Sequence, residues 1–232
     1  MPSTLSGNIE LRPGESIDEF MEGRLRLIQS KTGYRFSVDA VLLSEFVTIR
    51  KGDCLIDIGT GCGIIPLLLL LTKPVGFALG LEIQPNLADQ AARNARLNGL
   101  QGRMEVVLGD LRAPPLKGGI ANVVTCNPPY RPRRSGRLNP DMERAIARHE
   151  IRASMDDIIN MSRAVLRDKG RLAMIYPAAR LADLMVRMRI SGLEPKRMKV
   201  IYPGANSEAK LVLIEALKGG RPGLKILSPV IG

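Results

Sequence analysis

The chain has 232 residues, of which 45% are hydrophobic, and this is enough to build the core of one ordinary domain. Its 34 Lys and Arg against 23 Asp and Glu give a formal charge of +11, which favours a polyanionic partner. The longest apolar stretch, residues 64–71, is too short to span a bilayer. The chain has no Trp and only four Phe and four Tyr, so it lacks the aromatic surface on which a single-strand nucleic-acid binder stacks bases.

The first fifty residues are expected to form an N-terminal arm and a cap segment. Residues 1–16 are rich in Ser, Gly and Pro, and residues 16–19 (Ser-Ile-Asp-Glu) resemble the beginning of a helix. Residues 25–30 are expected to form a short strand, and residues 39–47 an amphipathic helix.

From residue 51 onward the pattern alternates between strands and helices. Strands are expected over residues 54–58, 77–83, 104–108, 121–126 and 171–176, and helices over residues 64–71, 86–97, 156–166 and 178–190. Gly170 is expected to close the third of these helices. Two final strands, residues 196–202 and 209–217, have no helix between them. This order predicts an α/β fold over residues 51–232: a Rossmann-like, doubly wound, seven-stranded sheet, mostly parallel with a reversed edge strand.

A glycine-rich turn follows the first strand of this sheet, where residues 57–63 read Asp-Ile-Gly-Thr-Gly-Cys-Gly. Glycines at alternate positions let the backbone turn tightly and approach a ligand closely, just before a helix. The spacing differs from the G-x-G-x-x-G pattern that cradles a pyrophosphate. The Asp57 carboxylate would also oppose a phosphate, but it suits a cationic ligand.

Acidic residues also end the next two strands. Glu82 is placed to accept hydrogen bonds from both hydroxyls of a ribose, and Asp110 to accept one from an adenine amino group. An adenosine, an ammonium group and no pyrophosphate together describe S-adenosylmethionine, which we expect as the cofactor. The structural alternative is that Glu82 and Asp110 cap helices and Asp57 ties a loop.

Asn127-Pro128-Pro129-Tyr130 follows the fourth strand. Neither proline can donate to a sheet, so the chain must leave the sheet at Asn127, and ligands bind at the carboxyl ends of parallel strands. Asn127 Oδ1 and the Pro128 carbonyl oxygen can each accept one hydrogen of an amino group, while Tyr130 stacks on its ring. The tetrapeptide therefore predicts a site for a planar group that carries –NH2; a plain proline turn is the structural alternative.

These motifs resemble those of class I S-adenosylmethionine-dependent methyltransferases, and Asn-Pro-Pro-Tyr resembles the signature of enzymes that methylate an exocyclic or amide nitrogen. More narrowly, the chain resembles the bacterial tRNA adenine-N6 methyltransferase family that acts on valine tRNA beside the anticodon. The similarity covers nearly the whole chain, through residues 36–43, 55–66, 127–130, 145–150, 194–197 and 219–227.

The resemblance implies that Asp57, Gly59 and Gly61 border the methionine part of the cofactor, that Glu82 holds the ribose and that Asp110 holds the adenine. It also implies that the segment before the first strand of the sheet closes over the cofactor, although residues 37–39 read equally well as a helix cap. With their neighbours, the expected cofactor-binding residues are Tyr34, Ser37, Asp39, Asp57, Gly59, Thr60, Gly61, Gly63, Glu82, Ile83, Asp110, Leu111 and Asn127. The expected catalytic residues are Asn127, Pro128, Pro129 and Tyr130.

The segment after Tyr130 is strongly basic, and its prolines and glycine predict a loop. Phosphate contact is its functional interpretation, and a solvated loop is the structural one. The residues expected to contact tRNA are Arg131, Arg133, Arg134, Arg137, Arg148 and His149. His149 is the only histidine, and we expect it at a helix start or on RNA rather than as a general base.

Three other functions stay open at this point. A protein-glutamine N-methyltransferase would use the same site for a carboxamide, but such enzymes usually carry a sizeable helical domain ahead of the first strand, and here only about fifty residues precede it. A non-catalytic, cofactor-binding RNA module and a DNA adenine methyltransferase are the others. The sequence gives no sign of the oligomeric state.

Cys54, Cys62 and Cys126 lie apart in apolar or turn segments. We expect reduced packing residues, and therefore a cytoplasmic protein. One His and no Cys/His cluster predict that no metal is bound, and no membrane partner is expected.

Overall fold

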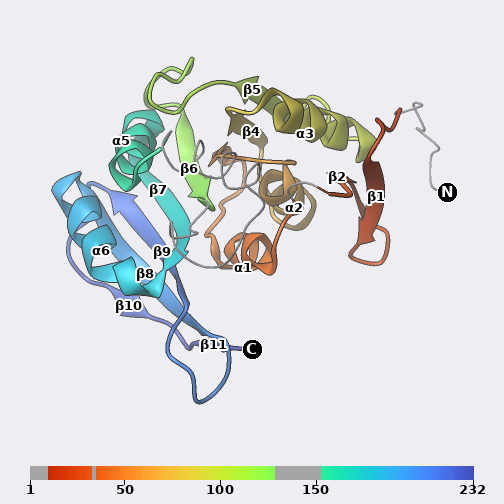
Figure 1. Ribbon diagram of the computed structural model, residues 1–232. Helices are drawn as coiled ribbons and strands as arrows, with labels where there is room; N and C mark the ends of the chain where they lie inside the picture. The colour runs from red at the N-terminus through yellow and green to blue at the C-terminus, as the bar shows by residue number, and fades with distance from the viewer. Residues whose placement is uncertain (1–9, 33–34, 129–152) are drawn as a thin grey trace.

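The computed structural model describes residues 10–32, 35–128 and 153–232. A central sheet runs through the molecule with helices on both faces, and a two-stranded hairpin lies beside it (Figure 1). In the described part of the chain, no helix is long and apolar enough to cross a membrane. The same residues contain no group of three or more His, Cys, Asp or Glu that could hold a metal ion.

Seven strands form the body of the central sheet, in the order β8-β9-β7-β6-β3-β4-β5. Their bounds are β3 (Cys54–Ile58), β4 (Phe77–Glu82), β5 (Met104–Leu108), β6 (Ala121–Cys126), β7 (Leu166–Pro177), β8 (Leu193–Tyr202) and β9 (Leu211–Lys218). Two short strands that the sequence did not predict, β10 (Lys225–Ile226) and β11 (Val230–Ile231), pair in parallel with β8. The structure confirms the doubly wound α/β fold.

The reversed strand is β9, and its expected place at the edge of the sheet is wrong. β9 lies between β7 and β8 and is antiparallel to both. Residues 211–216 are all buried, whereas most of β8 is only partly buried. A continuous run of buried residues needs cover on both faces and strand partners on both sides, so β9 takes the inner position.

Helices cover the two faces of the sheet and form two separate cores. On one face lie α1 (Val38–Phe46), α2 (Ile64–Thr72) and α3 (Pro85–Leu97). On the other lie α5 (Met155–Val165), the 3-10 turn η1 (Ala178–Arg180) and α6 (Leu181–Ile190). Every residue from 64 to 70 is buried, so α2 is apolar all round and lies deep in its core.

Helix α5 shows why Gly170 is not a helix stop. The helix begins with a capping box, in which Asp157 N donates to Ser154 Oγ (3.1 Å) and Ser154 N donates to Asp157 Oδ2 (2.8 Å). It ends at Val165, and β7 follows at Leu166 without a connecting loop. Gly170 therefore lies inside β7.

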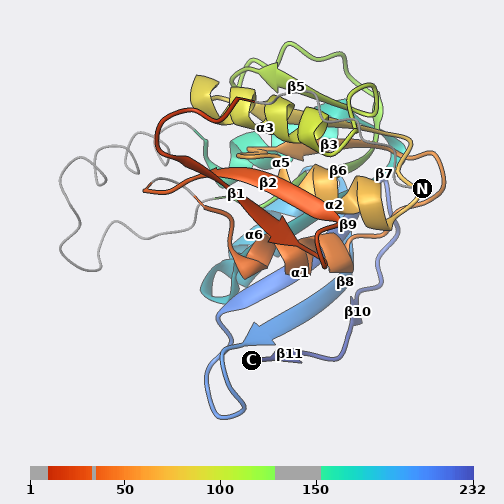
Figure 2. The same ribbon diagram turned by 90° about the vertical axis from the view of Figure 1, so that its right-hand side faces the viewer.

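The N-terminal hairpin consists of β1 (Glu15–Phe20) and β2 (Leu25–Ser30), so the helix expected to begin at residue 16 is wrong. Residues 21–23 all have positive φ and return the chain within a tight turn. Leu25 and Leu27 are fully buried in the core that also contains α2 and α3. Figure 2 shows the hairpin lying across this side of the molecule.

Candidate active site

The expected site segments meet at the carboxyl edge of the sheet. Parallel strands β3 and β6 are neighbours, and Ile58 pairs with Cys126. The glycine loop (residues 59–63) follows Ile58, and Asn127 follows Cys126, so the two segments leave the sheet side by side. On the other side of β3, the loop is tied to β4, because the backbone N–H groups of Gly59 and Thr60 both donate to Leu81 O (2.9 and 3.1 Å).

The glycine loop has a conformation that only glycine adopts readily. Gly59, Gly61 and Gly63 have φ of 69°, 59° and 86°. A Cβ on Gly63 would lie 2.8 Å from Met104 Cε, so this glycine also allows close packing of α2 against its neighbours. A Cβ on Gly59 would meet no atom within 4 Å, so its backbone is open to close approach by a ligand.

Glu82 holds the loop from the end of β4. Its side chain is 4% exposed, and Oε2 accepts a hydrogen bond from Gly61 N (2.9 Å). Oε1 accepts from the backbone N–H groups of Ile83 and Gln84 (both 2.9 Å). A carboxylate has about four acceptor positions, so three are used and one is left for a ligand. Its role towards a ribose stays a prediction, and the remaining position would serve one hydroxyl rather than both.

Asp57 is 1% exposed, and its two carboxylate oxygens have different surroundings. Oδ1 accepts a hydrogen bond from Thr125 Oγ1 (2.6 Å), a residue directly opposite it on β6. Oδ2 is buried without a hydrogen-bond partner among the described residues, and so is Thr60 Oγ1. Burial raises the pKa of Asp57 to about 7 and the Glu82 carboxylate adds to the rise, although the nearby hydroxyls of Thr125 and Thr60 act in the opposite direction.

Asp110 lies beside the end of β4, because Gly109 N donates to Glu82 O (2.9 Å). Its carboxylate is engaged by Arg112, which donates from Nη2 to Oδ2 (2.6 Å) and from Nε to both oxygens (3.1 Å). An adenine amino group would therefore share this acceptor with Arg112, a residue that the motif reading did not include. Leu111, between them, is partly buried.

The segment expected to close over the cofactor is described from residue 35 onward. Ser37 is exposed at the N-cap position of α1, but its side chain makes no capping hydrogen bond; Ala40 N instead donates to its backbone oxygen (3.1 Å). The structure therefore shows no side-chain hydrogen bond by which Ser37 would cap the helix. Asp39 is partly buried in the first turn of α1.

Asn127 and Pro128 are partly buried at the end of β6. The remaining predicted site residues lie outside the described residues: Tyr34, Pro129, Tyr130, Arg131, Arg133, Arg134, Arg137, Arg148 and His149. All three cysteines are free, with Cys62 and Cys126 buried and Cys54 partly buried.

Sequence reasoning missed Thr125, although a signal was present. Thr125 is a polar residue within the apolar run of residues 121–126, and strand register sets it opposite Asp57. It also missed Arg112, two residues after Asp110, and Asn94 of α3, whose carboxamide reaches Cys62 in the glycine loop. None of these residues belongs to a recognised motif, and each acts through a contact that forms only in the folded chain.

Comparison with known proteins agrees with this geometry. Residues 37–187 match the family model described as methyltransferase small domain. A curated Porphyromonas gingivalis protein named tRNA1(Val) (adenine(37)-N6)-methyltransferase is 30% identical over 206 residues, covering 85% of this chain and 80% of the relative. A Photobacterium profundum protein of the same name is 29% identical over 189 residues, covering 79% of this chain and 77% of the relative.

Solved structures show the same fold. A predicted O-methyltransferase from Agrobacterium tumefaciens has a TM-score of 0.66 and 20% identity, covering 83% of this chain and 86% of its own. P. horikoshii TYW2 in complex with MeSAdo has a TM-score of 0.62 and 14% identity, covering 89% of this chain and 72% of its own. With the family model matched over most of its length, the chain belongs to the methyltransferase small domain family.

Proposed function

We propose that the chain transfers a methyl group from S-adenosylmethionine to N6 of an adenine in tRNA, at position 37 of a valine tRNA as in the names of its curated relatives. The observation that carries the proposal is the position of Asn127 and Pro128, which leave β6 beside the glycine loop that follows β3. An acceptor pair for an amino group thus adjoins a loop suited to an adenosine-bearing cation.

The described residues fit this cofactor. Glu82 keeps about one acceptor position for a ribose hydroxyl, and the open side of Gly59 allows the ligand to approach the backbone. The buried Oδ2 of Asp57 would gain from a nearby cation, which favours the ionised carboxylate. Asp110 would share its oxygens between Arg112 and an adenine amino group. When bound, the cofactor supplies an electrophilic methyl group on a sulfonium sulfur.

The residues at the end of β6 would activate the target nitrogen. The lone pair of N6 is delocalised into the adenine ring, so the free amino group is a poor nucleophile. Asn127 Oδ1 and the Pro128 carbonyl oxygen would each accept one N6 hydrogen, which favours a pyramidal nitrogen with its lone pair directed at the methyl carbon. The N–C bond would form as the C–S bond breaks, and one N6 proton would pass to solvent. This is catalysis by positioning and electrostatics, with no strong general base.

The rest of the chain has consistent roles in this proposal. The charge of +11 suits a polyanion, and the arginines of residues 131–148 are assigned to the tRNA backbone. Residues 51–232 are taken as the catalytic domain and residues 1–50 as its N-terminal arm and cap segment. The adenine would enter unstacked from the anticodon loop, and the reaction would take place in the cytoplasm.

The test is the transfer of labelled methyl from S-adenosylmethionine to unmodified bulk tRNA, with cell protein incubated in parallel. We expect label in tRNA, released by digestion as N6-methyladenosine, and lost in a tRNA1(Val) variant without adenine at position 37. Label in protein alone would replace this function with glutamine methylation.

The Asn127→Ala variant tests the mechanism. It should lower turnover by at least about a hundredfold, because oriented polar groups at a reacting centre are worth that much, while cofactor affinity stays near that of the wild type. Cofactor binding measured by calorimetry is the control. A variant that turns over at the wild-type rate would refute the role given to this carboxamide.

A further inference from the structure

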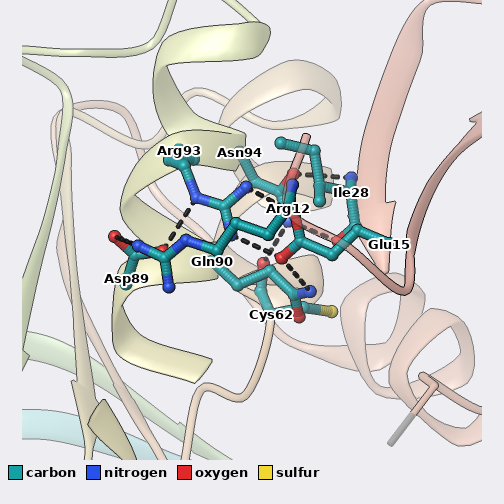
Figure 3. Close-up of polar contacts among 8 residues, drawn as sticks. All are labelled: Arg12, Glu15, Ile28, Cys62, Asp89, Gln90, Arg93 and Asn94. Atoms are coloured by element: carbon teal, nitrogen blue, oxygen red, sulfur yellow. Dashed lines mark hydrogen bonds and ion pairs between the residues drawn. The ribbon is translucent and has the colours of Figure 1, made fainter. Parts of the chain in front are cut away.

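The outer edge of β2 is bonded to a helix rather than to a strand. Asn94 of α3 and Asn98, the residue that caps the carboxyl end of α3, make the bonds. Ile28 N donates to Asn94 Oδ1 (2.7 Å) and Asn94 Nδ2 donates to Ile28 O (3.1 Å) (Figure 3). Arg26 N donates to Asn98 Oδ1 (2.9 Å) and Asn98 Nδ2 donates to Arg26 O (2.7 Å). Each carboxamide thus binds both backbone groups of one strand residue, as a neighbouring strand would.

Only one of the two asparagines also reaches the glycine loop. Asn94 Nδ2 donates to Cys62 O (2.9 Å), and both residues are almost completely buried. The corresponding second bond of Asn98 goes instead to Asn94 O within α3 (2.8 Å). Asn94 therefore joins three elements, namely the hairpin, α3 and the glycine loop, whereas Asn98 joins only the first two.

An ion pair fixes the other strand of the hairpin to the same helix. Arg93 donates to both carboxylate oxygens of Glu15 (2.5 and 2.8 Å), and the two side chains are only 8% and 11% exposed. Figure 3 shows this pair beside Asn94, with Asp89 also bonded to Arg93 (2.8 Å). Because the hairpin is held at β1 and at β2, Asn94 has a fixed strand on one side and the loop on the other.

We propose that Asn94 is a positioning residue for the cofactor: it holds the Cys62 carbonyl, sets the shape of the glycine loop and so couples the N-terminal hairpin to cofactor binding. Glu82 at the end of β4 accepts from Gly61 N, and Asn94 of α3 donates to the carbonyl of the next residue, Cys62, so two successive residues of the loop are bound by side chains from two different elements. The inference rests on the proposed function only in taking the glycine loop as part of the cofactor site.

The matched pair Asn94→Ala and Asn98→Ala separates the loop contact from the anchoring of the hairpin. Both variants of the full chain lose two bonds to β2 and should unfold at lower urea concentration. Only Asn94→Ala should weaken S-adenosylmethionine binding in calorimetry, by about tenfold, the equivalent of one net hydrogen bond. The turnover at saturating cofactor should stay within about twofold of wild type, so the change appears in the KM for the cofactor and not in kcat.

Two results would overturn the proposal: wild-type affinity in a folded Asn94→Ala variant, or an equal loss of affinity in both variants, which would assign the effect to the hairpin alone. If Asn94→Ala does not fold, amide exchange in the wild-type chain gives the test. Because coupling is reciprocal, the cofactor should slow exchange of the Ile28 amide more than that of the Arg26 amide. Equal exchange would reject the coupling. A chain that binds the cofactor but methylates no tRNA would refute the proposed function and leave this inference intact.

Discussion

The burial of the Asp57 carboxyl group lowers the stability of the fold at neutral pH, and this loss can be measured without a substrate. Its carboxyl group is buried, with a pKa raised to about 7 from the ordinary 3.8. In Asp57→Asn, the side-chain oxygen can still accept the hydrogen bond from Thr125, but the group no longer titrates. The difference between the two pKa values corresponds to about 4 kcal/mol of stability once the wild-type carboxyl group is forced to ionise.

The sign of the effect follows from which state binds the proton. Below about pH 4 the carboxyl group is protonated in both states, so folding keeps its full stability. Between about pH 4 and pH 7 the unfolded chain loses the proton while the folded chain keeps it, so stability falls as pH rises and levels off above about 7.

Urea unfolding without cofactor, at pH 5 and at pH 8, measures the effect. Relative to Asp57→Asn, the wild type should lose about 3 kcal/mol between these two pH values, because about two pH units of this interval lie below the folded-state pKa. Comparing the wild type with Asp57→Asn at each pH cancels the contributions of the other titrating groups to the free energy of unfolding. A free-energy difference that does not change with pH would refute the account of Asp57 as a carboxyl group disfavoured by burial.

Two further predictions concern the glycine loop and the hairpin. Gly63→Ala should lower the free energy of unfolding by about 2 kcal/mol, because residue 63 has φ of 86° and its new Cβ would lie 3.2 Å from Ala91 Cβ as well as 2.8 Å from the end of the Met104 side chain, whereas Gly99→Ala, at φ of 67° with no atom within 4 Å, should cost only about 1 kcal/mol. Equal losses in urea unfolding would contradict the packing argument. Arg93 lowers the pKa of Glu15 from 4.5 to about 2, so this carboxylate stabilises the fold above its ordinary pKa and the stabilisation is lost as pH falls towards 2. Glu15→Gln should therefore make the unfolding midpoint less sensitive to pH between 4.5 and 2, and an unchanged acid slope would show that the ion pair contributes nothing.

The sequence predicted the strands and helices best where the hydrophobic periodicity is regular. The strands and helices from residue 54 to residue 126 follow hydrophobic periodicity, and their positions agree closely with the structure. The error at residues 16–19 has a different origin. Ser-Ile-Asp-Glu resembles a helix start, but β1 is stabilised by pairing with β2 and by the bond of Glu15 to Arg93, which lies 78 residues away in the chain. Such contacts override local preference and leave no local signal.

The sequence predicted the site residues that belong to motifs, but not the residues whose contacts depend on strand register or on helix packing. Asp57, the glycine loop and Asn127 could be placed at strand ends because turn residues mark those ends. Thr125 became a partner of Asp57 only through the register between β3 and β6, strands that are not consecutive in the sequence. Asn94 lies inside the amphipathic pattern of α3, where nothing local separates a carboxamide that binds two other elements from one that faces solvent.

The glycine loop and Asp57 contribute to ligand binding in opposite ways. Side chains from two different layers, Glu82 and Asn94, hold the loop in one shape before any ligand arrives, so little ordering entropy remains to be lost on binding. Asp57 instead keeps a carboxyl group in a position that disfavours its charge, and a cation next to it would relieve that cost. A neutral ligand of the same shape would use the ordered loop without this gain. The preference for a sulfonium over the neutral thioether should therefore rise with pH and level off above about 7, where Asp57 is ionised before the ligand binds, and Asp57→Asn should reduce that preference.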